Sequence, residues 1–477
     1  MKKSEHLPAQ ARRRRLAPVV LLACVLLWAA GCAHTASLNQ PLQRFDAAAG
    51  YRLDNLPKGT NSDELFVILA FSGGGTRAAA FSYGVLEQLR QDHLVVQGAK
   101  RRVLDEVDVI SSVSGGSFTA AYYALFGDRI FDEFADRFLN QEVQGALLRR
   151  LLLHPLNWLR LMSPYFSRTD IAAEYYEQHI FGGASYSNLL ARGKPFLVIN
   201  ATDLVRGARL EFTQEQFDFL YSDLLPFPVA RAVTASSAFP GALVPITLQN
   251  HPAGADYRSP PWLTLALQDR DVNSRRWERA LTCASYLDKT NRPFIHLVDG
   301  GVSDNLGLRG PLASVESTDW DWSLRRDIQN RKVKTVVVIS VDAKTEPENT
   351  WNQREKAPNL IDVLLTASTM PMANYSGETA TRLVEEFDGW QQQGCLYRAL
   401  RAHEPGSYPP SPFHDVKFFP VHLCFDAITN APRRNYFNSI GTNFGLATND
   451  VAQLRTLGGE MLRNDSEYQR LLTEFAK

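Results

Sequence analysis

The feature that most constrains the fold is a repeated succession of a buried strand and a helix. The strand expected at 65–71 precedes helically spaced apolar residues at 81–90, and the strand expected at 107–113 runs directly into a helix at 118–126. Further apolar runs, of the kind buried on both faces of a parallel sheet, lie at 195–201, 294–298 and 333–341. This alternation predicts an α/β fold with a mainly parallel sheet and helices on both faces.

Composition narrows the class of protein. The chain has 477 residues, of which 45% are hydrophobic and 21% are charged, the balance of a soluble, core-forming protein. These proportions exclude a disordered chain, a collagen-like chain and a membrane protein with several spans. The formal net charge is zero, so bulk charge gives no support for a nucleic-acid partner. Five cysteines are too few for a scaffold built on disulfides.

The N-terminus has the layout of a bacterial export signal. Basic residues within 2–15 precede an apolar run at 16–31. Small residues stand directly before Cys32, as in the lipobox of bacterial lipoproteins, where the cysteine carries lipid. Ala29 stands where the lipobox has leucine, so a plain cleaved signal and an uncleaved anchor stay open as alternatives to lipidation of Cys32.

These features divide the chain into an export signal at 1–31, a polar tether at 32–63 and one large α/β domain at 64–470. They predict a protein of the bacterial cell envelope that is anchored to a membrane through its N-terminus and faces the periplasm. With Cys32 lipidated, at most one disulfide forms within the chain, and a Cys395–Cys424 pair is one guess. The three remaining cysteines are Cys283, Cys395 and Cys424.

A leucine-rich segment at 147–162 also contains arginines and a tryptophan. Its favoured interpretation is a core helix that breaks before Pro155, because amphipathic stretches usually face a core. The alternative is an interfacial element beside the active site.

Ser114 is the candidate nucleophile. The sequence SVSGG places it at a sharp turn between the strand at 107–113 and the following helix. Such an elbow exposes a serine at a helix N-terminus, where backbone N–H groups and the helix dipole favour a developing anion. The usual pattern is G-x-S-x-G, and Ser112 occupies its first position. The alternative role for Ser114 is a helix N-cap.

A glycine-rich turn follows the strand at 65–71. Gly73, Gly74 and Gly75 come before Thr76 and Arg77, and consecutive glycine amides can approach an oxyanion or a phosphate closely. The turn has neither the Gly-Lys-Ser/Thr of a Walker loop nor a G-x-G-x-x-G pattern. A tight turn of a parallel sheet alone does not explain three glycines followed by a positive charge.

Asp299 ends the apolar strand at 294–298 and is followed by two glycines. A carboxylate in that position can take a proton from Ser114, whereas a turn-forming aspartate is the alternative. Asp304 and Asn305 lack the alternating ligands of a calcium loop. We therefore predict no metal and no organic cofactor.

These motifs, in this order, resemble those of the patatin-like phospholipases. That family uses a glycine-rich oxyanion loop, an elbow serine and a D-G-G or D-G-A aspartate, as a Ser–Asp dyad without histidine. The segment TASSAFPGALVP at 234–245 resembles the family's A-S-x-A-x-P segment. The resemblance covers about 65–310 and implies a three-layer α/β/α patatin-like fold. It implies catalytic roles for Ser114 and Asp299 and an oxyanion hole at 73–75.

The glycine loop departs from the common family form D-G-G-G-x-R-G. Ser72 replaces the aspartate and Ala78 the last glycine, and the resulting SGGG-T-R form is similar to the cytosolic phospholipase A branch. The resemblance implies that Arg77 supports the loop or meets a lipid phosphate.

A catalytic triad is the alternative to the dyad. An α/β-hydrolase would place a histidine after the aspartate in the chain, and His403, His414 and His422 are available there. No motif surrounds them, and His296 reads as a strand residue, so we prefer the dyad.

The sequence thus predicts a membrane-tethered enzyme that hydrolyses carboxylic esters of lipids through an acyl-enzyme. The alternatives are a thioesterase or acyltransferase on the same scaffold, and a non-enzymatic lipoprotein that binds lipid or a protein partner.

Overall fold

The computed structural model describes residues 39–345, 357–403 and 413–476, together with residues 353, 355 and 411. The predicted export signal at 1–31 and the predicted lipidation site Cys32 lie outside the described residues.

An eight-stranded mixed sheet forms the centre of the molecule, in the order β12-β11-β2-β5-β6-β10-β9 with β7 beside β6. The run from β12 to β6 is parallel, and β7, β9 and β10 are antiparallel to their neighbours. Its strands are β2 (Leu65–Phe71), β5 (Val107–Val113), β6 (Phe196–Asp203), β7 (Ala208–Glu211), β9 (Ile246–Gln249), β10 (Phe294–Asp299), β11 (Thr335–Asp342) and β12 (Lys417–Cys424). Two small pairs complete the strands, β1 (Gln40–Pro41) with β8 (Ser222–Asp223) and β3 (His93–Val96) with β4 (Ala99–Arg102).

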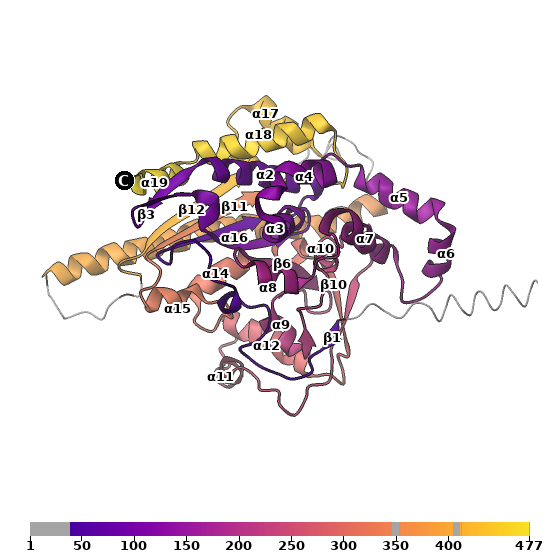
Figure 1. Cartoon of the computed structure of the whole chain (residues 1–477), viewed down its shortest axis with the longest axis horizontal. Helices are drawn as coiled ribbons and strands as arrows, with labels where there is room; N and C mark the ends of the chain where they lie inside the picture. The colour runs from indigo at the N-terminus through magenta and orange to yellow at the C-terminus, as the bar shows by residue number, and fades with distance from the viewer. Residues whose placement is uncertain are drawn as a thin grey trace, which may run out of the picture.

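Helices cover both faces of this sheet (Figure 1). The α2, α3 and α18 helices pack together on one face, and α13 and α16 pack together on the other. The helices are α2 (Gly75–Gln91), α3 (Gly115–Phe126), α4 (Ile130–Phe134), α5 (Val143–Leu153), α6 (Pro155–Leu161), α7 (Arg168–Tyr176), α8 (Tyr186–Arg192), α9 (Gln214–Phe219), α10 (Val229–Ser236), α11 (Pro261–Asp269), α12 (Arg275–Leu287), α13 (Gly301–Asp304), α14 (Arg309–Glu316), α15 (Leu324–Gln329), α16 (Leu360–His403), α17 (Ala431–Ser439), α18 (Thr448–Asn464) and α19 (Ser466–Glu474). The predicted three-layer α/β/α fold is confirmed.

Consecutive side chains of one strand face opposite layers, as strand geometry requires. Phe418 of β12 contacts Phe387 and Trp390 of α16, with ring centroids 5.0 and 5.4 Å apart. The next residue, Phe419, lies under the guanidinium of Arg470 from α19. This double coverage explains why the central strands are apolar along their whole length rather than alternating.

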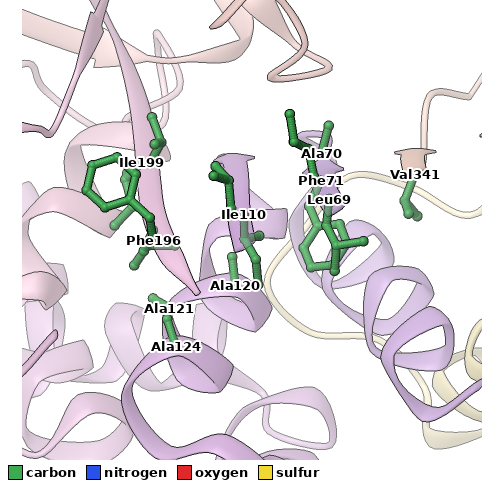
Figure 2. Close-up of a cluster of buried hydrophobic side chains, with 14 of the residues drawn as sticks. Leu69, Ala70, Phe71, Ile110, Ala120, Ala121, Ala124, Phe196, Ile199 and Val341 are labelled. Carbon is green, nitrogen blue, oxygen red and sulfur yellow. The ribbon is translucent and has the colours of Figure 1, made fainter. Parts of the chain in front are cut away.

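A cluster of buried hydrophobic side chains lies where α3 packs against the sheet (Figure 2). Every residue of β2 and of β5 is buried. Side chains of β2, β5 and β6 lie over three alanines of α3, which are Ala120, Ala121 and Ala124. These small residues let the helix backbone approach the sheet closely, and this helix begins directly after Ser114. The predicted nucleophile is therefore joined directly to a helix that packs on the core.

Part of the segment predicted as a tether packs against the domain. Tyr51 is fully buried, and its hydroxyl accepts a hydrogen bond of 2.8 Å from the amide of Leu197 on β6. Arg52 donates to Asp218 across 2.6 Å. Residues 39–63 thus belong structurally to the domain, because an aromatic ring and an ion pair supply the contacts that a mobile tether lacks.

The favoured interpretation of 147–162 as a core helix is wrong. The chain does break before Pro155, between α5 and α6, but Val143 is the only buried residue of the two helices. Leu153 and Leu156 are 72% and 73% exposed. The apolar side chains of the amphipathic segment at 147–162 are therefore largely exposed and do not belong to the core.

The three described cysteines are free thiols, so the guessed Cys395–Cys424 disulfide is absent among them. Cys395 is exposed on α16, whereas Cys424 ends β12. Within the described residues there is no group of three histidine, cysteine or acidic side chains placed to hold a metal ion. No helix in the same part of the chain is both long and apolar enough to cross a membrane.

Candidate active site

Ser114 occupies a strained elbow between β5 and α3. Its φ of +48° and ψ of −121° lie in a region that costs about 1–3 kcal/mol for a residue with a side chain. The amide of Ser114 donates to the Ser236 hydroxyl across 2.8 Å, and the Ser117 hydroxyl lies 3.1 Å from the same oxygen. These contacts hold the strained backbone in place. The predicted strand-to-helix elbow is thus present, with Ser114 between β5 and α3.

Glycines after Ser114 allow the elbow to contact the glycine loop. A Cβ on Gly115 would stand 2.0 Å from the carbonyl oxygen of Gly75, and a Cβ on Gly116 would stand 2.6 Å from that of Ser72. Real Cβ atoms do not approach backbone so closely. The glycines of SVSGG therefore serve the contact between two loops as well as the turn itself.

Asp299 meets Ser114 although 185 positions separate them in the sequence. The Ser114 hydroxyl donates to Asp299 Oδ2 across 2.8 Å, and the amide of Gly301 donates to Oδ1 across 2.8 Å. Asp299 is 3% exposed. Burial raises its pKa from 3.8 to about 6, while the hydrogen bonds from Gly301 and Ser114 act in the opposite direction. The structure thus brings a buried carboxylate with a raised pKa within hydrogen-bonding distance of the serine hydroxyl.

The segment 236–238 ties the two residues together. Ser236 accepts from the Ser114 amide through its hydroxyl and from the Gly300 amide through its carbonyl, across 2.8 and 3.1 Å. The carbonyl of Ala238 accepts from the Asp299 amide across 3.0 Å. These residues belong to the A-S-x-A-x-P segment of the sequence at 235–240. It acts as a brace between nucleophile and carboxylate.

The three glycines of the loop differ in what their amides do. The Gly73 amide donates to the carbonyl of Asn305 across 3.0 Å and is therefore engaged. The amides of Gly74 and Gly75 donate to no other described residue, and both glycines line the cavity beside Ser114. The amide of Gly115, the residue after Ser114, likewise donates to no other described residue. Sequence reasoning missed Gly115, although its place directly after an elbow serine is a usable signal.

Positive backbone angles explain two of these glycines. Gly74 has a φ of +138° and Gly75 a φ of +61°, which side chains rarely adopt. A Cβ on Gly75 would also stand 2.3 Å from the carbonyl oxygen of Asn443. The loop thus needs glycine for its own path and for the close approach of the C-terminal part of the chain.

Arg77 is buried and supports the loop. Its Nε donates to the carbonyl of Ala343 across 2.9 Å and its Nη1 to that of Ile440 across 2.5 Å. Burial lowers its pKa to about 10, against the opposing effect of Asp342. The guanidinium thereby links the start of α2 to two later segments, which is the first of the two roles that we expected.

A cavity of about 800 Å³ opens over Ser114 and Asp299. That volume lies within the range of small-molecule sites, and the lining is mainly apolar. The charged residues among its described lining are Arg77, Arg168, Asp299 and Lys344. Its larger apolar residues are Leu147, Leu148, Leu151, Ile171, Tyr176, Phe239, Leu243, Met370, Met372 and Phe444.

A scan against protein-family models matches residues 69–312 to the model described as "Patatin-like phospholipase". The chain belongs to the patatin-like phospholipase family. The match agrees with the resemblance carried by the sequence motifs. No curated protein matches the chain.

Two similar solved structures are those of human GIVD cytosolic phospholipase A2. One is 13% identical with a TM-score of 0.41 and covers 89% of this chain and 63% of that one. The other, in complex with methyl gamma-linolenyl fluorophosphonate inhibitor and terbium chloride, is 12% identical with a TM-score of 0.39 and covers 87% and 59%. This patatin-like chain thus spans about six tenths of the length of either structure.

The histidines of the triad alternative lie away from the cavity in this patatin-like protein. No described histidine lines it. His422 lies 3.2 Å from the Ser340 hydroxyl, and its pKa is lowered mainly by burial. His414 pairs with Asp415 across 2.7 Å, and His403 is exposed at the end of α16. His296 contacts Thr247 across 3.0 Å. In the described part of the chain, the Asp299 carboxylate is the one proton-accepting side chain in hydrogen-bond contact with the Ser114 hydroxyl.

Proposed function

We propose that the protein hydrolyses carboxylic ester bonds of lipids, phospholipids among them, through a Ser114–Asp299 dyad and an acyl-enzyme. The observation that carries the proposal is the 2.8 Å hydrogen bond from the serine hydroxyl to a buried carboxylate at the wall of an apolar cavity. Membership of the patatin-like phospholipase family supports the same reaction class.

In the first half of the reaction, ionised Asp299 accepts the Ser114 proton while the serine oxygen attacks the acyl carbonyl carbon. The resulting oxyanion accepts hydrogen bonds from the amides of Gly74 and Gly75, with Gly115 as a further donor. The positive end of α3 adds to this stabilisation. Collapse of the intermediate breaks the ester bond, and the leaving alcohol takes the proton from Asp299.

In the second half, a water molecule gives its proton to Asp299 and attacks the acyl-enzyme. The same amides stabilise the second oxyanion. Ser114 leaves with the proton that Asp299 held, and the fatty acid is released. The apolar lining of the cavity accommodates the acyl chain, and Arg168 and Lys344 supply positive charge for an anionic headgroup.

We further propose that the N-terminus attaches the protein to a membrane of the bacterial cell envelope through a lipid on Cys32. The basic and apolar residues of 1–31 and the small residues before Cys32 support this location. Mass spectrometry of the membrane-extracted protein tests it. A mature chain that begins with a diacylated Cys32 is expected, and a soluble chain beginning elsewhere would refute it.

Covalent labelling by a fluorophosphonate probe, followed by peptide mapping, tests the dyad. We expect the label on Ser114, its loss in Ser114→Ala, and full labelling of Ser314→Ala, a buried serine of α14 outside the cavity. A parallel panel of phospholipid, acyl-thioester and acyl-acceptor substrates separates an ester hydrolase from a thioesterase or acyltransferase. A folded protein that is neither labelled nor active would favour a lipid-binding role.

A further inference from the structure

Two short helices beside the cavity form an exposed apolar surface. We call residues 143–165, which contain α5 and α6, the leucine–arginine arm. Figure 1 shows α5 and α6 at the margin of the molecule, beyond the layers that cover the sheet. Leu153, Leu156 and Met162 are 72%, 73% and 69% exposed, and Trp158 is 55% exposed. Exposed apolar side chains gathered in this number usually mark a site of interaction.

The charge of the arm is of one sign. Residues 143–165 contain three arginines and no aspartate or glutamate. Arg160 pairs with Glu174 of α7, and Arg150 lies over the Tyr175 ring and donates to Gln178. Arg149 is exposed and has no partner among the described residues. The arm thus carries a net positive charge that neighbouring α7 only partly neutralises.

The apolar surface of the arm continues into the active-site cavity. Leu147, Leu148 and Leu151 of α5 line that cavity, and Leu148 is also 53% exposed. Met370 of α16 is a further lining residue and is 58% exposed. An acyl chain moving from outside into the cavity would therefore stay in contact with apolar side chains.

We propose that the leucine–arginine arm docks the protein on the surface of an anionic lipid bilayer, with its leucines in the acyl region and its arginines at the phosphates. This inference rests on the proposed function, since it places the mouth of the cavity against the lipid. Arginines interleaved with leucines suit a bilayer interface, where the long side chains reach the headgroups while the helix lies in the plane.

Trp158 fits the same orientation. Its indole N–H donates to the carbonyl of Leu151 across 2.9 Å, which fixes the ring on the arm. Tryptophan is enriched at the boundary between acyl chains and headgroups. A second copy of the chain is a poorer occupant, because two such surfaces would bring like charges together.

Trp158 also provides a reporter that is independent of attachment through the N-terminus. We would use the full chain as Ser114→Ala, so that vesicles stay intact, and subtract the signal of the same protein with Trp158→Phe. Vesicles of phosphatidylcholine and phosphatidylglycerol containing brominated acyl chains should quench the Trp158 signal strongly. Vesicles of brominated phosphatidylcholine alone should quench it weakly, because the arginines then lack anionic partners.

Hydrolysis by the protein with Ser114 intact separates docking from catalysis. The triple variant Leu153→Ser, Leu156→Ser and Met162→Ser changes residues outside the cavity lining. We expect its kcat/KM on a soluble short-chain ester to be unchanged, and its rate on anionic vesicles to fall at least about 10-fold. The control Leu265→Ser and Val272→Ser changes apolar residues that are 51% and 61% exposed elsewhere, and should retain both activities.

The outcomes distinguish the two proposals. Unquenched Trp158 together with an unchanged vesicle rate in the triple variant would overturn docking by the arm. Self-association that the triple variant abolishes, without quenching by vesicles, would also overturn it by assigning the surface to a second copy. Absence of hydrolysis of either substrate by the unaltered protein would refute the proposed function, and quenching would then decide the docking alone.

Discussion

Ser236 shows how much of the active-site geometry depends on one residue outside the reacting pair. Its hydroxyl holds the amide of the strained nucleophile, and its carbonyl holds the amide of Gly300, next to the carboxylate. A buried amide left without its partner costs about 1–3 kcal/mol, and here that cost falls on the conformation that aims Ser114.

We therefore predict that Ser236→Ala lowers kcat for a soluble ester by about 10- to 100-fold while KM changes little. Ser236→Thr, which keeps the hydroxyl, should restore a large part of the activity. Steady-state kinetics on the two variants, with circular dichroism to check folding, measure this. A proportional loss in both variants would mean that the site is only sensitive to packing.

The raised pKa of Asp299 makes a second prediction, for the pH dependence of activity. Only the ionised carboxylate can accept the Ser114 proton, and its pKa is about 6. The kcat/KM for a neutral ester should thus rise with pH through about 6 and then level off. The measurement is kcat/KM between pH 4.5 and 9 in buffers of constant ionic strength. A profile governed by a group near 7 that disappears in a His422→Ala or His414→Ala variant would restore the triad.

The raised pKa of Asp299 also predicts that its charge supports activity at the expense of the free energy of unfolding. A raised folded-state pKa means that the ionised Asp299 destabilises the fold above pH 6, and that protonation relieves this as the pH falls toward 4. Asp299→Asn removes the buried charge, and its amide can still accept from Gly301 and contact Ser114. We expect an inactive variant that is at least as stable at pH 8, by up to about 3 kcal/mol, with a smaller difference at pH 5. Denaturant titrations at the two pH values check it, and a marked loss of stability at pH 8 would contradict it.

At the scale of elements, the α2 and α18 helices pack through glycines. A Cβ on Gly84 would stand 2.0 Å from the backbone oxygen of Arg455, and a Cβ on Gly458 would stand 2.5 Å from that of Phe81. Backbone cannot yield as a flexible side chain does. The spacing of the two helices is thus set by the absence of side chains at these positions.

We predict that Gly84→Ala destabilises the protein by about 1–3 kcal/mol or more and lowers its Tm. The matched control is Gly389→Ala in α16, where an added Cβ meets no atom within 4 Å. Because alanine favours a helix over glycine, this control should be neutral or stabilise by up to about 1 kcal/mol. Thermal unfolding followed by circular dichroism compares the two, and equal effects would refute the packing argument.

At the scale of the whole molecule, the family match at 69–312 does not contain everything that the site needs. The β11 and β12 strands complete the sheet beside β2. The carbonyl of Ala343 binds Arg77, and that of Asn443 accepts from the Thr76 amide across 2.9 Å. Residues after 312 therefore contact the glycine loop and the start of α2 through these hydrogen bonds.

We accordingly predict that a chain truncated after residue 345 does not form a stable active domain. Removing β12 exposes an edge of the central sheet, and removing the segment around Asn443 releases the start of α2. Limited proteolysis and fluorophosphonate labelling of the truncated chain measure this, beside the full chain. Efficient labelling of a protease-resistant fragment would contradict the prediction.

The local features of the site were predictable from the sequence because they depend on neighbours in the chain. The strands expected at 65–71 and 107–113 match β2 and β5. A strand that is buried on both faces consists mainly of apolar residues, so its sequence alone reveals it. Ser114 and the glycine loop were predictable because each follows a strand of the parallel part of the sheet, where functional loops gather. Asp299 ends β10, which is antiparallel to its neighbours, and was predicted from the two glycines that follow it and from its motif.

Other features were decided only by contacts between distant parts of the chain. The sequence could not tell that 39–63 packs on the domain, that Ser236 braces Ser114, or that the Gly73 amide is engaged by Asn305. It also could not tell which way the amphipathic segment at 147–162 faces, because an apolar helix face that meets a core and one that meets a lipid surface have the same periodicity. Only the tertiary structure shows which face the rest of the molecule leaves uncovered.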